Sequence, residues 1–336
     1  MSKIIGIGNA LVDVLVYLPD EKLLNEMSLP KGAMTHVDRK GLMRLRQRLV
    51  GMPIERATGG SAANTIHAMS VLGDVTGVIG AVGDDETGRF FAEQARSRGI
   101  ETHLAVIADE QTGTANTLIT PDHERTFATH LGAAVHLGEA LKEVNLSDYD
   151  LLHIEGYLLQ DHIQLGEILK AAKAAGLTVS YDLASWNIVR DHHAMITEYI
   201  RDYVDIAFAN EEEAAAFYGQ NDPESALRQL ASLTDIAVVK VGKRGAMGMS
   251  RATGDRIVFA PGLERTAVDT TAAGDFFAAG FLHGWIHGET LDTCMDFGNR
   301  TAAEVIQVIG TQVDPERLRK SLTPDPSPKG EGSRIH

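Results

Sequence analysis

Cysteine is almost absent from this sequence. Cys294 is the single cysteine among 336 residues, so no disulfide can form within the chain and a reducing compartment is expected. Long apolar runs are also missing, because no stretch approaches the ~18 residues of a membrane-spanning helix. The first segment, MSKIIGIGNALVDVLVYLPDEK, is a poor signal peptide because Asn9 and Asp13 interrupt its apolar run. These features predict a cytoplasmic protein that spans no membrane.

Positive charge is scarce as well. Lys and Arg number 31 against 46 Asp and Glu, which gives a formal net charge of −15. Nucleic acids call for a basic surface, so this balance argues against a nucleic-acid partner. It does not exclude an anionic small molecule, because local basic groups can oppose the overall field.

Short apolar runs alternate with amphipathic segments along the chain. The runs are mostly apolar on consecutive positions, which is typical of strands buried on both faces of a parallel sheet. They cover residues 3–8, 75–82, 150–156, 177–182, 204–210 and 236–242. Helices are predicted over 61–73, where Ser61 is a candidate cap, and over 87–99 and 164–176; each ends at a glycine. Repeated strand–helix units indicate an α/β domain.

The segment VDTTAAGDFFAAGFLHGW (268–285) places Asp275 at the start of an apolar helix. Small residues before it leave the first backbone N–H groups open, and the helix dipole favours an anion there. A carboxylate beside an anion cradle is unfavourable unless it has another task, such as accepting a proton from an alcohol that attacks a phosphoryl group. A plain helix cap is the alternative for Asp275.

DTTAAGD (269–275) resembles the DTxGAGD signature of the ribokinase-like (PfkB) carbohydrate kinase family. GGSAANTIHAMSVLG (59–73), followed by GAVGDDETG (80–88), resembles a second motif of that family, in the expected order. The resemblance covers about residues 3–312 and is strongest to the adenosine kinase-like branch. It implies a doubly wound, mostly parallel sheet flanked by helices, with a small β flap or lid.

The resemblance implies a catalytic base at Asp275 and an anion hole made by the N–H groups of Ala273, Gly274 and Asp275. Ala272 departs from the family pattern, which has glycine there. If its backbone needs a positive φ, the Cβ costs about 1–2 kcal/mol; otherwise the methyl group only narrows the cradle.

Other candidate residues would bind the acceptor molecule. An amide suits a vicinal diol because it both donates and accepts, and Asp13 between two valines would otherwise be an unpaired buried carboxylate. Arg125 could neutralise a phosphoryl group and Tyr157 could stack on a ring, although surface or core packing explains both equally well. The candidate acceptor-binding residues are Asn9, Asp13, Gly59, Gly60, Asn64, Arg125 and Tyr157.

Candidate residues for ATP and ions follow from the same resemblance. An N-x-x-E motif maps to Asn210 and Glu213, with Glu213 acting on Mg²⁺ through water, and Asp269 and Thr271 lie where relatives hold a K⁺-like ion. The candidate nucleotide-binding residues are Asn210, Glu213, Lys240, Gly242, Gly245 and Asn299. The segment GNALVD (8–13) does not match the G-x-G-x-x-G fingerprint of dinucleotide-binding proteins. The segment GKR (242–244) is not a Walker A loop, because Arg244 stands where that loop has Ser or Thr. The thirteen histidines show no HExxH pattern, and no transition-metal site is predicted.

We therefore expect one kinase domain over 1–321, with lid segments at about 13–38 and 112–130 that form an antiparallel flap, and a disordered tail over 322–336. The predicted activity is Mg·ATP-dependent phosphorylation of a primary hydroxyl on a sugar or nucleoside, adenosine or ribose-like. A fructose or 2-keto-3-deoxy sugar acid kinase and a catalytically silent, ligand-sensing relative are the alternatives. Monomer and lid-mediated homodimer both stay open.

Overall fold

A computed structural model describes residues 2–122 and 124–323. The predicted tail lies outside these residues from position 324 onward. The strands are β1 (Lys3–Ile7), β2 (Leu11–Tyr17), β3 (Met34–His36), β4 (Ile54–Gly59), β5 (Val75–Gly83), β6 (Glu101–Ile107), β7 (Gly113–Ile119), β8 (Arg125–His130), β9 (Leu151–Glu155), β10 (Thr178–Asp182), β11 (Ile206–Asn210), β12 (Ile236–Lys240), β13 (Gly245–Ser250) and β14 (Val258–Pro261).

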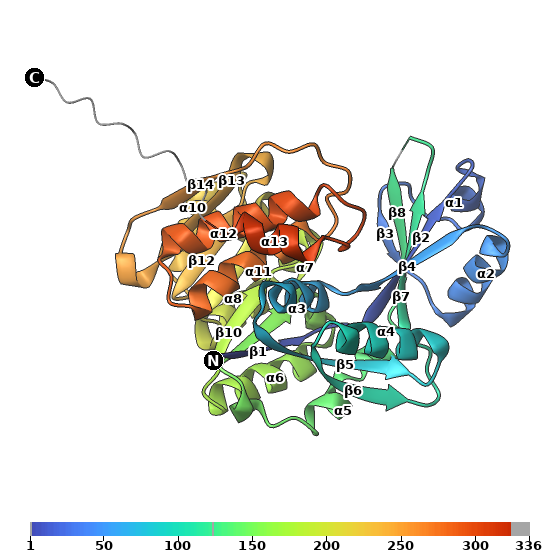
Figure 1. Cartoon of the computed structure of the whole chain (residues 1–336), viewed down its shortest axis with the longest axis horizontal. Coiled ribbons are helices and arrows are strands. Elements are labelled where there is room, and N and C mark those ends of the chain that lie inside the picture. Colours follow the sequence, from blue (N-terminus) through green and yellow to red (C-terminus); the bar gives the residue numbers. More distant parts are fainter. Residues whose placement is uncertain (1, 123, 324–336) are drawn as a thin grey trace, which may run out of the picture.

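The helices connect these strands and cover the larger sheet (Figure 1). They are α1 (Lys22–Glu26), α2 (Arg39–Leu49), α3 (Ser61–Leu72), α4 (Glu86–Ser97), α5 (Leu137–Leu141), α6 (His162–Ala174), α7 (Trp186–Asp191), α8 (His193–Tyr203), α9 (Glu211–Tyr218), α10 (Pro223–Ala231), α11 (Ala273–Ile286), α12 (Leu291–Val305) and α13 (Pro315–Ser321). Short 3-10 turns are η1 (Gly132–Val135), η2 (Leu146–Asp148), η3 (Gly156–Asp161), η4 (Gly242–Arg244) and η5 (Arg251–Thr253). No helix in the described ranges is long and apolar enough to cross a membrane.

The larger sheet has the order β14-β13-β12-β11-β10-β9-β1-β5-β6. Its strands pair in parallel from β11–β12 through to β6, whereas β12–β13 and β13–β14 are antiparallel. β1 pairs with β5 on one side and with β9 on the other, so the strand order reverses at β1. The predicted doubly wound, mostly parallel sheet is confirmed. Ligands of such sheets bind beyond the carboxyl ends of the strands at the point of reversal.

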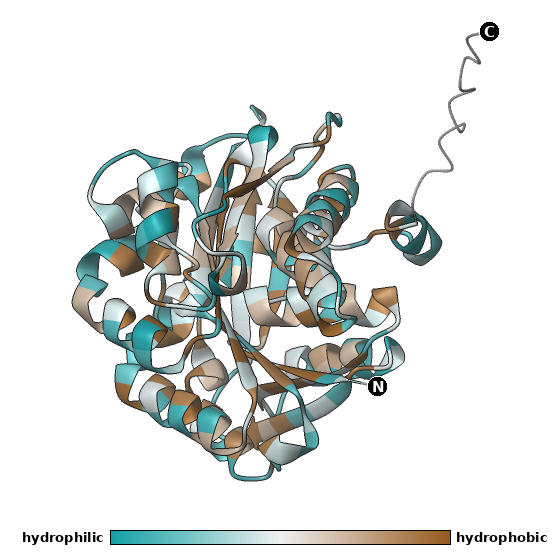
Figure 2. Ribbon diagram, turned by 90° about the vertical axis from the view of Figure 1, so that its left-hand side faces the viewer, coloured by the Kyte–Doolittle hydropathy of each residue, from teal (hydrophilic) through white to brown (hydrophobic). Residues whose placement is uncertain are grey.

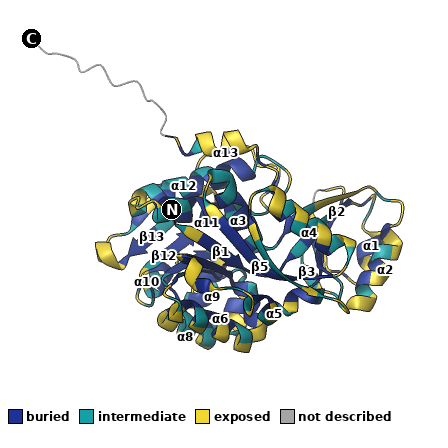
Figure 3. Cartoon of the chain, turned by 60° about the horizontal axis from the view of Figure 1, so that its bottom comes forward, coloured by how far each residue is buried: buried dark blue, intermediate teal, exposed yellow. Residues whose placement is uncertain are grey.

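Helices cover both faces of this sheet because its strands are apolar on both sides. Ile5 and Ile7 pack into the core formed with α5, α6, α8, α9 and α10, while Ile4 packs with α3, α11 and α12 on the opposite face. In Figure 3 the strands are dark blue and the outward faces of the helices are yellow. Figure 2 shows the matching hydropathy, with teal concentrated on outward surfaces. Successive side chains of a strand point to opposite faces of the sheet, so each strand contributes residues to a separate core on each face.

A second sheet, ordered β3-β8-β7-β2-β4, forms the predicted lid. The expectation of an antiparallel flap is wrong for two of its pairings, because β2 pairs with β7 and β3 pairs with β8 in parallel. The sheet also takes in β4, which follows α2 and lies outside the predicted lid segments. The exposed, polar first half of β4 gave little signal for a strand.

Helices α1 and α2 pack against the outer face of the second sheet. Leu23, Leu24, Leu45 and Leu49 join the sheet residues Val16, Leu118 and Ala128 in one buried cluster. In Figure 1 these two helices lie at the far edge of the molecule, beyond the strands of this sheet. The part of the face beneath them is not available to a second subunit.

Candidate active site

A cavity of about 380 Å³ lies between the carboxyl edge of the larger sheet and the inner face of the second sheet. Residues that follow β1, β9, β10, β11 and β12 line it, together with the start of α3 and α11. A second depression, of about 580 Å³, lies against α2 and the start of α4 and contains none of the predicted site residues. We place the site in the smaller cavity because the strand edges converge there.

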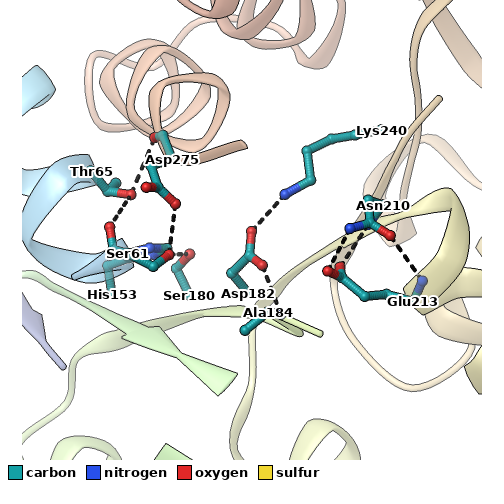
Figure 4. Close-up of polar contacts among 10 residues, drawn as sticks. All are labelled: Ser61, Thr65, His153, Ser180, Asp182, Ala184, Asn210, Glu213, Lys240 and Asp275. Atoms are coloured by element: carbon teal, nitrogen blue, oxygen red, sulfur yellow. Dashed lines mark hydrogen bonds and ion pairs between the residues drawn. The ribbon is translucent and has the colours of Figure 1, made fainter. Parts of the chain in front are cut away.

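Asp275 is the third residue of α11 and faces the start of α3 (Figure 4). Ser61 Oγ donates to Asp275 Oδ1 over 2.7 Å, and Asn64 Nδ2 donates to Oδ2 over 2.8 Å. Burial raises the pKa of Asp275 to about 6, although these two hydrogen bonds lower it. The carboxylate is therefore ionised at neutral pH and remains basic enough to accept a proton.

The prediction that Ser61 caps α3 is wrong. The N-cap is Gly60, whose φ of 94° no other residue adopts readily, and a Cβ there would lie 2.3 Å from Asn9 O. Ser61 is instead the first helical residue, so its hydroxyl is free to reach Asp275 on the neighbouring helix. Sequence reasoning missed this contact because it joins residues 214 positions apart.

The start of α11 forms a cradle of backbone amides. Ala273 N–H donates to Thr270 O over 3.2 Å, and Phe276 N–H donates to Ala272 O over 2.9 Å. The amides of Gly274 and Asp275 lie between these two, where a helix offers its first N–H groups no partner of its own. Two of the three predicted anion-hole donors therefore face the cavity, while the Ala273 amide is bonded within the turn.

Ala272 adopts the left-handed conformation, with φ 61° and ψ 7°. The sequence allowed either a positive φ or an ordinary backbone conformation at Ala272, and the structure has the strained, positive φ. A Cβ in this region costs about 1–2 kcal/mol, which explains why the related motif has glycine here. The chain keeps the fold of the cradle at the expense of local strain.

Lys240 and Asp182 form a buried ion pair on the far side of the cradle. Lys240 Nζ lies 2.7 Å from Asp182 Oδ2, and a Cβ on Gly274 would lie 3.1 Å from the same ammonium group. Burial lowers the pKa of Lys240, but the negative charges of Asp182 and Glu213 raise it by a larger amount. The pKa therefore lies above its usual value. Sequence reasoning missed Asp182, although an acid that ends a buried strand, here in LTVSYD, is a usable signal.

Asn210 and Glu213 form a closed pair at the start of α9 (Figure 4). Asn210 N and Nδ2 donate to the Glu213 carboxylate over 2.8 and 2.6 Å, and Glu213 N donates back to Asn210 Oδ1. Burial and the neighbouring Asp182 raise the pKa of Glu213 to about 8. This is a capping box, so the N-x-x-E motif has a structural task in addition to any role toward a metal.

Two polar side chains in the cavity come from the loop after β1 and from the second sheet, namely Asn9 and Asp13. Asn9 N and Nδ2 donate to Glu155 Oε1 over 2.9 and 2.8 Å, which fixes the Asn9 side chain. Asp13 projects from β2 beside Gly59, where a Cβ would lie 2.3 Å from Asp13 Oδ1. Burial, then Asp275 and Asp269, raise the pKa of Asp13 to about 7. No hydrogen bond to the Asp13 carboxylate comes from the described residues, so both oxygens are open to a ligand.

Glu155 is a second residue that sequence reasoning missed. Its other oxygen, Oε2, accepts from Ala62 N over 3.0 Å, so one carboxylate ties the loop after β1 to the start of α3. Burial raises its pKa to about 7, against the hydrogen bonds from Ala62 and Asn9. An acid at the end of a buried strand is again the signal that was available.

Tyr157 lines the cavity together with an apolar wall that the second sheet supplies. Tyr157 follows β9 in η3, as predicted for an aromatic residue at a strand end. The wall consists of Leu11, Met34, Phe127 and Leu131. The same sheet also contributes Asp13, His36 and Thr129 to the lining, so apolar and polar groups lie side by side there.

Arg125 joins the second sheet to the loop before α11. Its Nη1 donates to Asp269 Oδ1 and to Thr271 Oγ1, each over 2.5 Å. The other Asp269 oxygen accepts from Gly310 N over 2.8 Å. Burial raises the pKa of Asp269, but its hydrogen bonds lower it below the usual value. The guanidinium pairs with this carboxylate and so already offsets the negative charge that a K⁺ at Asp269 and Thr271 would meet.

Three candidates for the nucleotide lie outside the cavity lining. Asn299 Nδ2 donates to Ala260 O over 2.9 Å and to Pro261 O over 3.2 Å, which ties α12 to β14. Gly242 and Gly245 bound the η4 turn with φ of 57° and 113°. Their part in binding the nucleotide stays a prediction.

The assembled groups suit phosphoryl transfer to an alcohol. A carboxylate base lies beside free helix-terminal amides, a buried lysine faces the same cradle, and two further carboxylates lie at the phosphate end. Phosphoryl transfer depends mainly on such positioning and on charge stabilisation. The chain matches the pfkB family carbohydrate kinases over residues 47–317 and belongs to this family, whose kinases use ATP, typically with Mg²⁺.

Similar proteins agree with the family and narrow the class. The solved adenosine kinase of Sinorhizobium meliloti is 32% identical, with a TM-score of 0.83, 95% of this chain and 98% of that chain covered. A probable sugar kinase from Rhizobium etli is 30% identical, with a TM-score of 0.85 and coverages of 95% and 97%. The adenosine kinase of Schizophyllum commune is 26% identical over 341 residues, which cover 92% of this chain and 96% of the relative. The chain is a sugar or nucleoside kinase.

We expect Ala272→Gly to raise the free energy of unfolding by about 0.5–1 kcal/mol. Relief of the left-handed strain contributes ~1–2 kcal/mol, and the greater freedom of glycine in the unfolded chain offsets ~0.5–1 kcal/mol. Denaturant unfolding measures the difference. Ala273→Gly is the matched control, because Ala273 lies in α11 with ordinary helical backbone and glycine should destabilise it. A loss of stability in Ala272→Gly would contradict the strained conformation.

The acid limb of kcat should follow Asp275, because kcat reports groups that titrate in the substrate complex, whereas the acid limb of kcat/KM would also follow Asp13 in the free protein. Only its ionised form accepts a proton, and its raised pKa of about 6 means that activity is lost as the pH falls through that value. Ser61→Ala removes a hydrogen bond that lowers this pKa, so the limb should move to higher pH. Ser232→Ala, which alters an exposed serine, should leave the profile unchanged. A limb that stays in place or moves down in Ser61→Ala contradicts this assignment.

Proposed function

We propose that the acceptor is a nucleoside, with adenosine the foremost candidate, and that its primary hydroxyl takes the γ-phosphoryl group of ATP. The carrying observation is that one cavity combines an apolar wall (Leu11, Met34, Phe127, Leu131 and Tyr157) with a polar floor, by which we mean its buried carboxylates and amides. A base is planar and apolar on its faces, whereas a ribose presents vicinal hydroxyls. Adenosine kinases at 26% and 32% identity support the same choice.

The polar floor supports ribose binding by two groups. Asp13 has two oxygens open to the cavity, and an ionised carboxylate accepts hydrogen bonds from two neighbouring hydroxyls. Asn9 is fixed by Glu155, so its side chain is preorganised rather than mobile. Asn64 lies between this floor and Asp275, which places it near the hydroxyl that reacts.

The apolar wall supports a base rather than a free sugar. Leu11, Met34, Phe127 and Leu131 come from the second sheet, and Tyr157 comes from the larger domain. Aromatic and aliphatic side chains on two sides suit stacking against a flat ring. A bare ribose would leave this surface in contact with water.

In the proposed reaction Asp275 accepts the proton of the primary hydroxyl as its oxygen attacks the γ-phosphorus of ATP. The bond from that phosphorus to the β,γ-bridging oxygen breaks, and ADP leaves. The Gly274 and Asp275 amides and Lys240 stabilise the negative charge on the transferring group. The second sheet covers the cavity and excludes water, which would otherwise compete as acceptor.

The carboxylates at the phosphate end fit Mg²⁺. Asp182 and Glu213 lie close enough that Asp182 raises the pKa of Glu213, and both line the cavity. Both Glu213 oxygens accept from Asn210, and Asp182 Oδ2 pairs with Lys240. Such carboxylates fit an ion that keeps most of its waters, as Mg²⁺ does, and its charge would favour their ionised forms. Asp182 and Glu213 would hold the ion, Glu213 through water. When bound, Mg²⁺ would supply positive charge that offsets the negative charge of the phosphates.

Two alternatives have weaker support. A sugar-acid substrate needs a cation at the acceptor end, but Lys240 is the sole Lys or Arg among the lining residues and its partner is Asp182. A silent sensing relative rests on Ala272, yet its left-handed backbone keeps the shape of the cradle. Asp275, Lys240 and the open amides remain in place.

The direct test is ADP release from Mg·ATP with adenosine, other nucleosides, ribose, fructose and 2-keto-3-deoxygluconate. Adenosine should give the highest kcat/KM. Asp275→Asn should lower kcat by about 10²–10⁴-fold because it removes the base. ATP binding by calorimetry should be retained.

Asp255→Asn is the control for loss of one negative charge, since Asp255 is exposed and lies outside the cavity. Near-normal turnover in Asp275→Asn would overturn the mechanism. Preference for a free sugar would overturn the nucleoside proposal alone.

We further propose that the enzyme does not depend on K⁺. Arg125 supplies a fixed positive charge to Asp269 and Thr271, the residues that the family resemblance links to that ion. Equal initial rates in potassium and sodium salts at matched ionic strength are expected. A rate several-fold higher in potassium contradicts this proposal.

A further inference from the structure

Two histidines and an aspartate converge on the side of the molecule where α3 and α11 end. Asp74 Oδ2 lies 2.9 Å from His283 Nδ1, and Asp74 Oδ1 lies 3.0 Å from His287 Nε2. One ligand atom from each of the three residues lies within 4.8 Å of the others. The kinase chemistry uses none of them, and none lines the active-site cavity.

The local structure explains why the three groups meet. His283 and His287 are one helical turn apart at the end of α11, so both project from the same face. α3 ends at Gly73, whose left-handed backbone (φ 103°) turns the chain so that Asp74 follows directly. The spacing His283–His287 was present in the sequence, but Asp74 lies 209 positions away and only the fold adds it.

The three side chains of the cluster differ in their exposure to solvent. The Asp74 side chain is 2% exposed, that of His283 19% and that of His287 55%. Neither Lys nor Arg from the described residues pairs with Asp74. Two imidazoles contact this buried carboxylate, and the exposed His287 makes one side of the cluster accessible from solvent.

The donor set matches a transition metal rather than Mg²⁺ or Ca²⁺. Imidazole nitrogens suit Zn²⁺, Cu²⁺ and Ni²⁺, and Zn²⁺ is commonly bound by two histidines four residues apart on a helix plus a carboxylate. Tetrahedral Zn²⁺ with bonds of about 2.0–2.1 Å separates its ligand atoms by about 3.3 Å. A single oxygen, Asp74 Oδ1, lies 3.1 Å from His283 Nδ1 and 3.0 Å from His287 Nε2, which is close to this separation. All three ligand atoms lie within 4.8 Å of one another, so rotation of the two imidazoles toward each other completes the site.

We propose that Asp74, His283 and His287 form a Zn²⁺ site in which water is the fourth ligand. The ion joins the end of α3 to the end of α11. These are the same two helices whose opposite ends bring Ser61 and Asn64 to Asp275. The alternative is a pair of histidine–aspartate hydrogen bonds that binds no metal.

The test is calorimetric titration of ZnCl₂ into the tag-free, EDTA-stripped full chain, with excess Mg²⁺ present to occupy carboxylate sites. One Zn²⁺ per chain is expected. His287→Ala should weaken binding at least tenfold, because loss of even an outer-shell partner of a metal ligand costs about 10–100-fold. At free Zn²⁺ of ~100 times Kd, Tm should rise by about 4 °C, and His287→Ala should lose this rise.

His162→Ala is the matched control, since His162 is exposed at the start of α6 and lies far from the cluster in sequence. It should bind Zn²⁺ as the unaltered chain does. His287→Gln provides a second variant that keeps the side-chain volume. Co²⁺ in place of Zn²⁺ should give the intense visible absorption of tetrahedral coordination, and this absorption should disappear in both His287 variants. Equal Zn²⁺ affinity in all four proteins, or no binding, would overturn the proposal.

Discussion

The contact between the starts of α3 and α11 is the interaction on which the site depends. Ser61 and Asn64 hold both oxygens of Asp275, and Thr65 Oγ1 also donates to the Asp275 backbone carbonyl over 3.2 Å. These bonds fix the orientation of the base and offset the penalty of burying its charge. Because α11 also supplies the amide cradle, one helix pair positions the proposed base and the proposed phosphate site together.

Buried negative charge is the second constraint. Asp13, Glu155, Asp182, Glu213 and Asp275 lie around one cavity, and Lys240 is the cation that lines it with them. Burial raises the pKa of four of these acids, Asp13, Glu155, Glu213 and Asp275. The arrangement is unfavourable in isolation and is relieved by ligands that donate hydrogen bonds or carry positive charge. The cavity is thus complementary to hydroxyls and to a metal–nucleotide complex.

Much of this was predictable, for identifiable reasons. Gly-terminated helices and two-sided apolar runs indicated an α/β domain with a parallel sheet, and the family resemblance implied its doubly wound order. The motifs around Asn64 and Asp275 located the two helix starts. The contacts of Asp182 and Glu155 could not be predicted, because they join strands and loops distant in sequence. The part of β4 in the second sheet was also missed, since β4 begins with the exposed residues Ile54 and Glu55. The backbone conformation of Ala272 could not be predicted either, because the sequence permits more than one.

Gly274 is a position where substitution by alanine would have two opposing effects. In a helix, alanine is more favourable than glycine by about 1 kcal/mol, so substitution there would ordinarily strengthen α11. A methyl group at this position would approach the Lys240 ammonium to 3.1 Å, tighter than nearly all such contacts, and would fill the space above the amides. The position is therefore one where helical stability and access for a phosphate oppose each other, and the hydrogen of glycine preserves access.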